Sequence, residues 1–175
     1  MLDELVADPG PAAGWRDVEL LDEQVLTAGS QVPDFVLGTE DGQKFTRSDL
    51  LGKTTVLVFY PFAFSPVCTD QLALYDEVRD ELEREHDAVV YGVSCDSSWS
   101  QKAFREKLGV GIAQLSDFEP KGAACKAFGV LHEGGFPQRA LLISDPDGAV
   151  RFSYQADSPG DLPGVNLIFD GLSSL

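Results

Sequence analysis

One cysteine, Cys68, lies where an apolar run gives way to the start of a helix, in the stretch YPFAFSPVCTDQL. Ser65 is a favoured residue type for capping a helix N-terminus, and Pro66 is favoured at the first helical position. Cys68 then stands third in the helix, where the partial positive charge of the helix start favours a thiolate, which is a nucleophile. A buried cysteine in a first turn is equally well an inert apolar side chain. Local sequence leaves both interpretations open.

Two further cysteines, Cys95 and Cys125, and two histidines, His86 and His132, are the remaining candidates for metal binding. No Cys-x-x-Cys pair occurs, and each histidine adjoins acidic residues, so we expect no structural zinc site. An odd number of widely spaced cysteines also argues against a secreted disulfide framework. It favours a reducing cytoplasm.

A buried strand and a helix must position Cys68. Residues 54–62 (TTVLVFYPF) form a continuous β-branched and apolar run, which is typical of a strand buried on both faces. Apolar residues from Leu72 to Leu82 then recur at helical spacing, with charged residues between them. The sequence therefore predicts a strand, a loop and a helix around the thiol.

Strands and helices alternate along the rest of the chain, in the order β-β-β-α-β-α-β-α-β-β-α. This order indicates an α/β fold with a central mixed sheet flanked by helices and an N-terminal β-hairpin. In the second helix we expect Trp99, Ala103, Phe104 and Leu108 to share a face and Gly109 to end the helix. The remaining expected elements are a hairpin over 33–46, a helical turn within 48–53, strands over 87–96 and 111–117, helices over 97–110 and 119–130, a hairpin over 138–154, and a helix within 159–175.

The length of 175 residues suits one domain with a sizeable core. Residues 1–29 are predicted to be an N-terminal arm, in which 15–26 form a short helix or strand, and residues 30–175 the folded domain. The first residues lack a basic start followed by an apolar core, so we expect no secretory signal. No apolar run is long enough to span a bilayer.

The charge of the chain is strongly acidic, with 29 Asp and Glu against 13 Lys and Arg and a net charge of −16. A field of this sign repels nucleic acid and anionic membranes, so neither is expected as a partner. The acidic residues are spread along the chain and only six lysines occur. This pattern favours a protein from a salt-loving organism over an ordinary acidic cytosolic protein.

The segment from Pro61 to Cys68 (PFAFSPVC) resembles the active-site motif of the peroxiredoxins, Pro-x-x-x-Thr/Ser-x-x-Cys. The resemblance extends from about Val32 to Tyr154. The segment LSDFEPKGAACKAFGVLHE is similar to the one-cysteine alkyl hydroperoxide reductases of the AhpE type, with the bacterioferritin-comigratory type close behind. QRALLISDPDGAVRF resembles the segment that supplies the family's active-site arginine, here Arg139.

The resemblance implies a thioredoxin-like fold and the reduction of hydrogen peroxide and organic hydroperoxides, without metal or haem. It implies that Cys68 attacks the peroxide and becomes a sulfenic acid. Arg139 would stabilise the thiolate and the negative charge that develops on the leaving oxygen. The resemblance also implies that Ser65 orients the peroxide and Pro61 excludes water. Two positions depart from the family pattern: many members have threonine at Ser65 and glutamate at Gln71. An amide can still accept a hydrogen bond from the arginine.

The way in which the oxidised sulfur is reduced divides the family. The position five residues after Cys68, a usual place for a second reactive cysteine, holds Ala73. We therefore expect a one-cysteine mechanism with an external small thiol or redoxin as reductant. If a disulfide does form, Cys95 is the expected partner, because its strand ends at the sheet edge that carries Cys68. Cys125, inside a helix, is the less favoured candidate.

Two other functions remain as alternatives. A thiol-disulfide oxidoreductase of the same fold would exchange disulfides, although Ser65 stands where a Cys-x-x-Cys motif has its first cysteine. A non-catalytic binding or chaperone protein would keep the fold without the chemistry, against which the intact set of Pro61, Ser65, Cys68 and Arg139 argues. The resemblance further implies a homodimer joined through loops around the site, or a larger ring.

Overall fold

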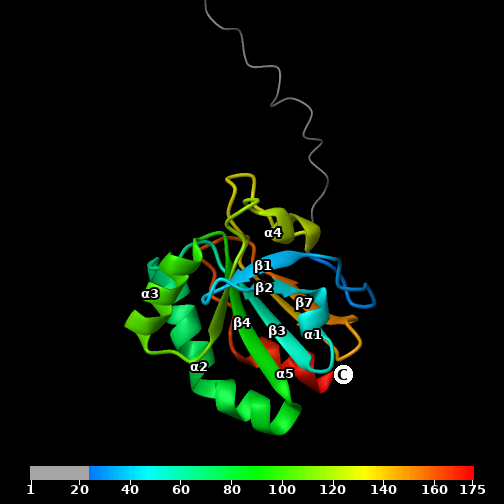
Figure 1. Cartoon of the computed structure of the whole chain (residues 1–175). Helices are drawn as coiled ribbons and strands as arrows, with labels where there is room; N and C mark the ends of the chain where they lie inside the picture. The colour runs from blue at the N-terminus through cyan, green and yellow to red at the C-terminus, as the bar shows by residue number, and fades with distance from the viewer. Residues whose placement is uncertain (1–23) are drawn as a thin grey trace, which may run out of the picture.

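The computed structural model describes residues 24–175, which form a seven-stranded mixed sheet in the order β2-β1-β5-β4-β3-β6-β7 with helices on both faces (Figure 1). The strands are β1 (Val36–Thr39), β2 (Lys44–Thr46), β3 (Thr54–Phe59), β4 (Ala88–Ser94), β5 (Ala113–Ser116), β6 (Ala140–Ser144) and β7 (Val150–Gln155). The helices are α1 (Arg47–Leu50), α2 (Pro66–His86), α3 (Ser98–Leu108), α4 (Ala123–Ala127) and α5 (Asn166–Ser173).

The centre of the sheet is β3, which pairs in parallel with β4 and antiparallel with β6. All six residues of β3 are buried, because both faces of the strand are covered. Successive side chains of a strand point to opposite faces. Val56 and Val58 accordingly pack into one core layer, and Leu57 and Phe59 into the other.

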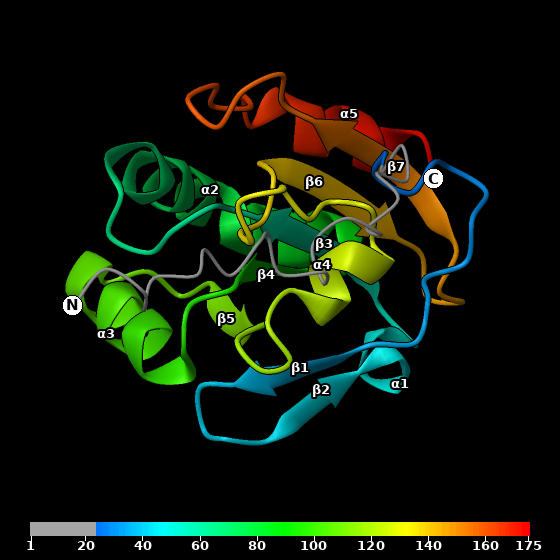
Figure 2. The same ribbon diagram turned by 90° about the horizontal axis from the view of Figure 1, so that it is seen from above.

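The two core layers contain different helices. The layer with Val56 and Val58 receives apolar side chains from α2, α3 and α5. The layer with Leu57 and Phe59 receives Leu50 of α1 and side chains of α4, together with the β1–β2 hairpin. Figure 2 shows α2 and α5 on one side of the sheet and α1 on the other. Two residues that follow neighbouring strands at the same end of the sheet can therefore pack into opposite core layers.

The predicted order of strands and helices is confirmed along the described part of the chain, including the N-terminal hairpin and the hairpin of β6 and β7. Gly109 ends α3 in the left-handed conformation, as expected. The predicted arm over 1–29 and the element over 15–26 lie largely outside the described residues. Within residues 24–175, no helix is both long and apolar enough to cross a membrane.

Two local predictions were wrong. The helix expected over 119–130 is shorter, because Gly122 has a left-handed backbone (φ 75°) that cannot continue a right-handed helix, and α4 begins only at Ala123. Trp99 was expected on the inner face of α3 but is 84% exposed, and Ala103 is also exposed. The helix instead turns Phe104 and Gln101 into the core.

Candidate active site

The start of α2 carries the predicted reactive cysteine. Ser65 occupies the N-cap position and Pro66 the first helical position, as the sequence predicts. The Ser65 hydroxyl donates to the Phe62 carbonyl at 3.0 Å and makes no cap bond to the helix amides. Phe64 takes a left-handed backbone conformation (φ 67°), which lets the chain turn sharply into the helix. The loop between β3 and α2 is thus closed by hydrogen bonds from the Ser65 hydroxyl and the Ser65 N–H to the Phe62 carbonyl.

Cys68 lies in the first turn of α2 and is fully buried. Its neighbours in the core layer include Val58, Tyr60 and Leu72. Pro61, at the beginning of the loop, is also buried, whereas Ser65 is half-buried. Pro61 and Ser65 in the loop thus adjoin Cys68 in the first turn of α2, and burial shields the sulfur from bulk water.

Arg139 reaches this sulfur from the residue before β6. Its Nη2 atom donates to Cys68 Sγ at 3.3 Å, and the arginine is only 2% exposed. Nε and Nη2 also donate to the Pro159 carbonyl at 2.9 Å and 2.8 Å, which fixes the plane of the guanidinium. A cationic donor held against a sulfur stabilises the negative charge of a thiolate, so the pair is suited to nucleophilic chemistry.

Gln71, one turn after Cys68, orients the arginine from the other side. Its carbonyl oxygen accepts a hydrogen bond from Nη1 of Arg139. Its amide nitrogen donates to the Tyr75 hydroxyl at 3.2 Å, and that hydroxyl donates to the Pro163 carbonyl at 2.7 Å. Burial raises the pKa of Tyr75 to about 12, so the phenol stays protonated and keeps this donor. The expected hydrogen bond between the amide and the arginine is present.

Asp96 anchors the loop from the end of β4. Its carboxylate accepts the Ala63 N–H at 2.8 Å and the Ser94 hydroxyl at 2.8 Å. Gln101 of α3 in turn donates to the Ser94 oxygen at 2.9 Å. Sequence reasoning missed Asp96, Tyr75 and the Pro159 carbonyl. Of these, only Asp96, an acidic residue close to the end of a buried strand, gave a signal in the sequence, and such residues are common.

Cys95, the expected partner if a disulfide formed, does not pack beside Cys68. It lies near the same sheet edge, but it packs into the layer of Phe59 and Val93, whereas Cys68 packs into the opposite layer. The reason is the alternation of side chains: Val93 and Cys95 share one face of β4 and its extension. Cys95 instead lies beside Cys125, and all three cysteines are free thiols.

Comparisons with known proteins agree with this geometry. The sequence pattern of the AhpC/TSA family matches residues 28–153. Alkyl hydroperoxide reductase E of Mycobacterium tuberculosis is 32% identical over 155 residues, which span 86% of this chain and 99% of that protein. Peroxiredoxin Q from the chloroplast of Suaeda salsa is 34% identical over 131 residues, spanning 74% of this chain and 60% of that protein.

Solved structures share the fold. AhpC of Enterococcus faecalis superposes with a TM-score of 0.74 at 29% identity, covering 85% of this chain and 92% of that one. AhpC of Mycobacterium tuberculosis superposes with a TM-score of 0.75 at 27% identity, covering 86% and 93%. The predicted thioredoxin-like α/β fold is confirmed. With the buried Cys68–Arg139 pair at a helix start, these likenesses show that the chain belongs to the AhpC/TSA family of peroxiredoxins and is a thiol-dependent peroxidase.

Proposed function

We propose that Cys68 is the peroxidatic residue and that the chain reduces hydrogen peroxide and organic hydroperoxides. The contact of the Arg139 guanidinium with Cys68 Sγ carries this proposal. The thiolate sulfur attacks one peroxide oxygen, the O–O bond breaks, and the leaving oxygen takes a proton and departs as water or an alcohol. Cys68 becomes a sulfenic acid, having lost two electrons to the peroxide.

Arg139 would stabilise negative charge at two stages of this reaction. In the resting enzyme it stabilises the thiolate, and during attack its donors stabilise the negative charge that moves onto the leaving oxygen. Both roles require a fixed guanidinium, and the Pro159 carbonyl and Gln71 oxygen hold it from two directions. No reorganisation of the arginine is then needed at the moment of attack.

Ser65 and Pro61 would bind and shield the peroxide. The Ser65 proton is engaged with the Phe62 carbonyl, which leaves lone pairs on the hydroxyl oxygen free to accept a hydrogen bond from a hydroperoxide. Pro61 is buried beside this loop and contributes no N–H that would compete for the substrate. Phe62 and Phe64 are each 49% exposed and give the loop an apolar rim suited to alkyl groups.

An external thiol or redoxin would reduce the sulfenic acid. Cys95 and Cys125 lie in the opposite core layer from Cys68, which argues against a disulfide between Cys68 and either of them. Ala73 occupies the position five residues further along the chain. This arrangement favours the one-cysteine subtype.

The test is to expose the reduced protein to limiting hydrogen peroxide in the presence of dimedone and to map the peptides by mass. We expect one dimedone adduct on the peptide that contains Cys68, and no adduct on that peptide in a Cys68→Ser variant. A quantitative disulfide from Cys68 to either other cysteine would overturn the one-cysteine proposal. Rapid exchange with a disulfide substrate, without consumption of peroxide, would instead support the oxidoreductase alternative.

We also propose a homodimer joined through the loops around the site. Phe62, Phe64 and Trp99 are large apolar side chains that are exposed in the single chain, Trp99 at 84%. Burial of such side chains is a main stabilising contribution at protein interfaces. Sedimentation should show a dimer that Trp99→Ser weakens and that Leu51→Ser, a change at an exposed residue of the loop after α1, leaves intact. A monomeric parent protein would contradict the proposal.

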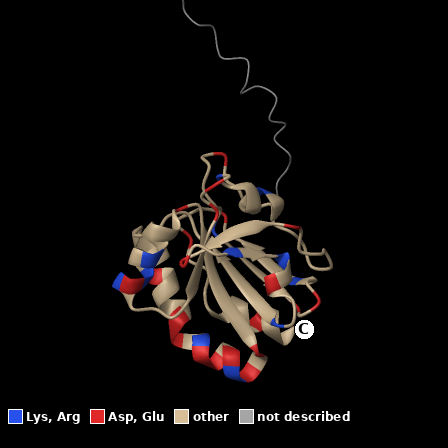
Figure 3. Cartoon of the chain, viewed as in Figure 1, with Lys and Arg blue, Asp and Glu red and all other residues tan. Residues whose placement is uncertain are grey.

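The cellular setting is proposed from charge and thiol content. Acidic residues outnumber Lys and Arg along α2 (Figure 3). Together with the net charge of −16, this excess supports an origin in a salt-rich cytoplasm. Three free cysteines fit the same reducing compartment. The salt dependence of stability, predicted below, tests the halophilic part.

A further inference from the structure

We propose that Cys95 and Cys125 form a second redox centre, a dithiol that hydroperoxides oxidise to an internal disulfide independently of Cys68. The two sulfurs and a carboxylate oxygen of Asp117 all lie within 4.8 Å of one another. The residues come from three separate segments: the turn after β4, the turn after β5, and α4. This pairing does not rest on the peroxidase mechanism, because Cys68 packs in the opposite core layer.

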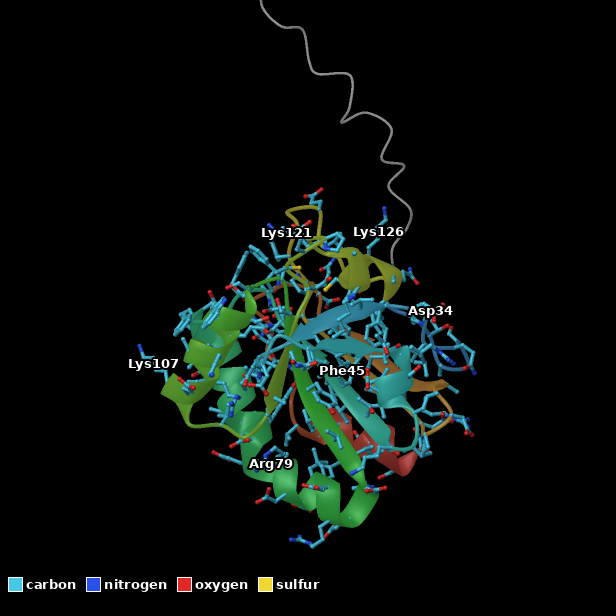
Figure 4. The ribbon with its side chains drawn as sticks, viewed as in Figure 1. Asp34, Phe45, Arg79, Lys107, Lys121 and Lys126 are labelled. Carbon is cyan, nitrogen blue, oxygen red and sulfur yellow. The ribbon has the colours of Figure 1, made fainter. Side chains whose placement is uncertain are left out.

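The two thiols differ in burial and in charge. Cys125 is fully buried and Cys95 is 7% exposed. The neighbouring Cys125 thiol lowers the pKa of the Cys95 thiol against the opposing effect of burial, whereas the Cys95 thiol and burial together raise the pKa of Cys125. Figure 4 shows Lys121 and Lys126 at the end of the molecule that carries α4. Cys95 is therefore the nucleophile and Cys125 the protonated partner.

Asp117 has a structural role that leaves the two sulfurs as the reactive pair. Its Oδ1 accepts the Ala124 N–H at 3.1 Å and its Oδ2 accepts the Cys125 N–H at 2.8 Å, so the carboxylate holds the first turn of α4. The hydrogen bond from the Cys125 N–H to Asp117 fixes the position of Cys125 opposite Cys95. Structural zinc sites have four ligands, whereas only three converge here among the described residues, one of them engaged with the helix.

The reaction balances in two steps. The Cys95 thiolate attacks a hydroperoxide oxygen, the O–O bond breaks, and the leaving oxygen takes a proton from solvent, which yields Cys95 sulfenic acid and an alcohol or water. The Cys125 sulfur then attacks the Cys95 sulfur. Its proton leaves with the sulfenic hydroxyl as water, and the S–S bond forms. Closing the bond to about 2 Å requires a side-chain rotation, since the sulfurs begin within 4.8 Å.

The test uses the full chain with Cys68→Ser, so that the peroxidatic thiol cannot contribute. The reduced protein is treated with excess hydrogen peroxide, denatured with a thiol-blocking reagent, and mapped without reduction. We expect a loss of two hydrogens, a cross-linked peptide pair containing Cys95 and Cys125, and reversal by a dithiol reductant. Both cysteines remaining fully alkylated after this treatment would overturn the proposal.

A matched control is the Cys68→Ser, Cys125→Ser double variant. There the sulfenic acid on Cys95 has no partner, so dimedone should label Cys95 and no loss of two hydrogens should occur. Should the double variant fail to fold, the Cys68→Ser map alone decides the pairing. The metal content of the purified protein gives a separate check: stoichiometric zinc that prevents alkylation of both thiols would assign these residues to a metal site and overturn the redox centre.

Discussion

Arg139 Nη2 lies 3.3 Å from Cys68 Sγ, although the two residues are 71 positions apart in the chain. Cys68 lies in the first turn of α2, and Arg139 directly precedes β6. The antiparallel pairing of β3 and β6 brings these two positions together, with Phe59 opposite Ala140. The central strand pair therefore sets the distance between the Cys68 sulfur and the Arg139 guanidinium.

Cys68→Ser should remove the rapid turnover of peroxide and leave at most the slow oxidation of the Cys95–Cys125 pair, because serine at this position has no nucleophile comparable to a thiolate. The measurement is consumption of hydrogen peroxide with an excess of small thiol. Cys125→Ser is the control and should retain the rapid turnover at Cys68, because Cys125 lies in the opposite layer and belongs to the separate Cys95–Cys125 pair. Substantial activity in Cys68→Ser would move the chemistry to another residue.

Arg139→Ala should slow the reaction of Cys68 with peroxide by roughly 100- to 1,000-fold. The reason is the loss of one preorganised charge stabiliser, which contributes roughly 3–4 kcal/mol to the transition state. Stopped-flow mixing with excess peroxide gives the second-order rate. Arg139→Lys keeps the charge but loses the paired hydrogen bonds to the Pro159 carbonyl, so its rate should lie between those of the parent and of Arg139→Ala. A rate within threefold of the parent for Arg139→Ala would show that the arginine is only structural.

Gln71→Leu should lower the same rate by roughly tenfold or more, since hydrogen bonds to charged groups contribute about 1.5–3 kcal/mol. Leucine removes the acceptor that holds Nη1 of Arg139 and also the donor to Tyr75. Gln71→Glu retains an acceptor and adds a charge partner, so its rate should stay within a few-fold of the parent. Equal rates for both variants would mean that Pro159 alone orients the arginine.

Ser65→Ala should lower the rate of peroxide attack by up to roughly tenfold, in line with one neutral hydrogen bond. Ser65→Thr keeps the hydroxyl and restricts its rotamer, so it should match or exceed the parent. The rate is measured for both hydrogen peroxide and a bulky alkyl hydroperoxide. An unchanged rate in Ser65→Ala with both substrates would remove the hydroxyl from peroxide binding.

The melting temperature should rise as potassium chloride increases into the molar range. The screening length falls from about 10 Å at 0.1 M to about 3 Å at 1 M, which relieves repulsion among exposed carboxylates. The net charge of −16 makes this repulsion large. Thermal unfolding followed by circular dichroism provides the measurement, with sucrose at matched viscosity as the control. A flat or falling curve favours an ordinary acidic protein.

The sequence by itself determined the features that arise within a few residues. The β-branched run of β3, the apolar spacing of α2 and the Ser65–Pro66 start predict the strand, the helix and the position of Cys68 at its first turn. These follow from local backbone preferences and hydrophobic periodicity. The left-handed Gly122 that shortens α4 is also a local effect, because glycine adopts this conformation without a steric penalty.

Only the tertiary structure decided which side chains meet. The alternation along β4 places Val93 and Cys95 on one face, but the face on which α2 packs depends on how the whole sheet is covered. Cys95 therefore meets Cys125 instead of Cys68, and Arg139 meets Cys68 through the pairing of β3 with β6. Such contacts join residues distant in sequence, and their distances depend on packing between elements, which no local pattern encodes.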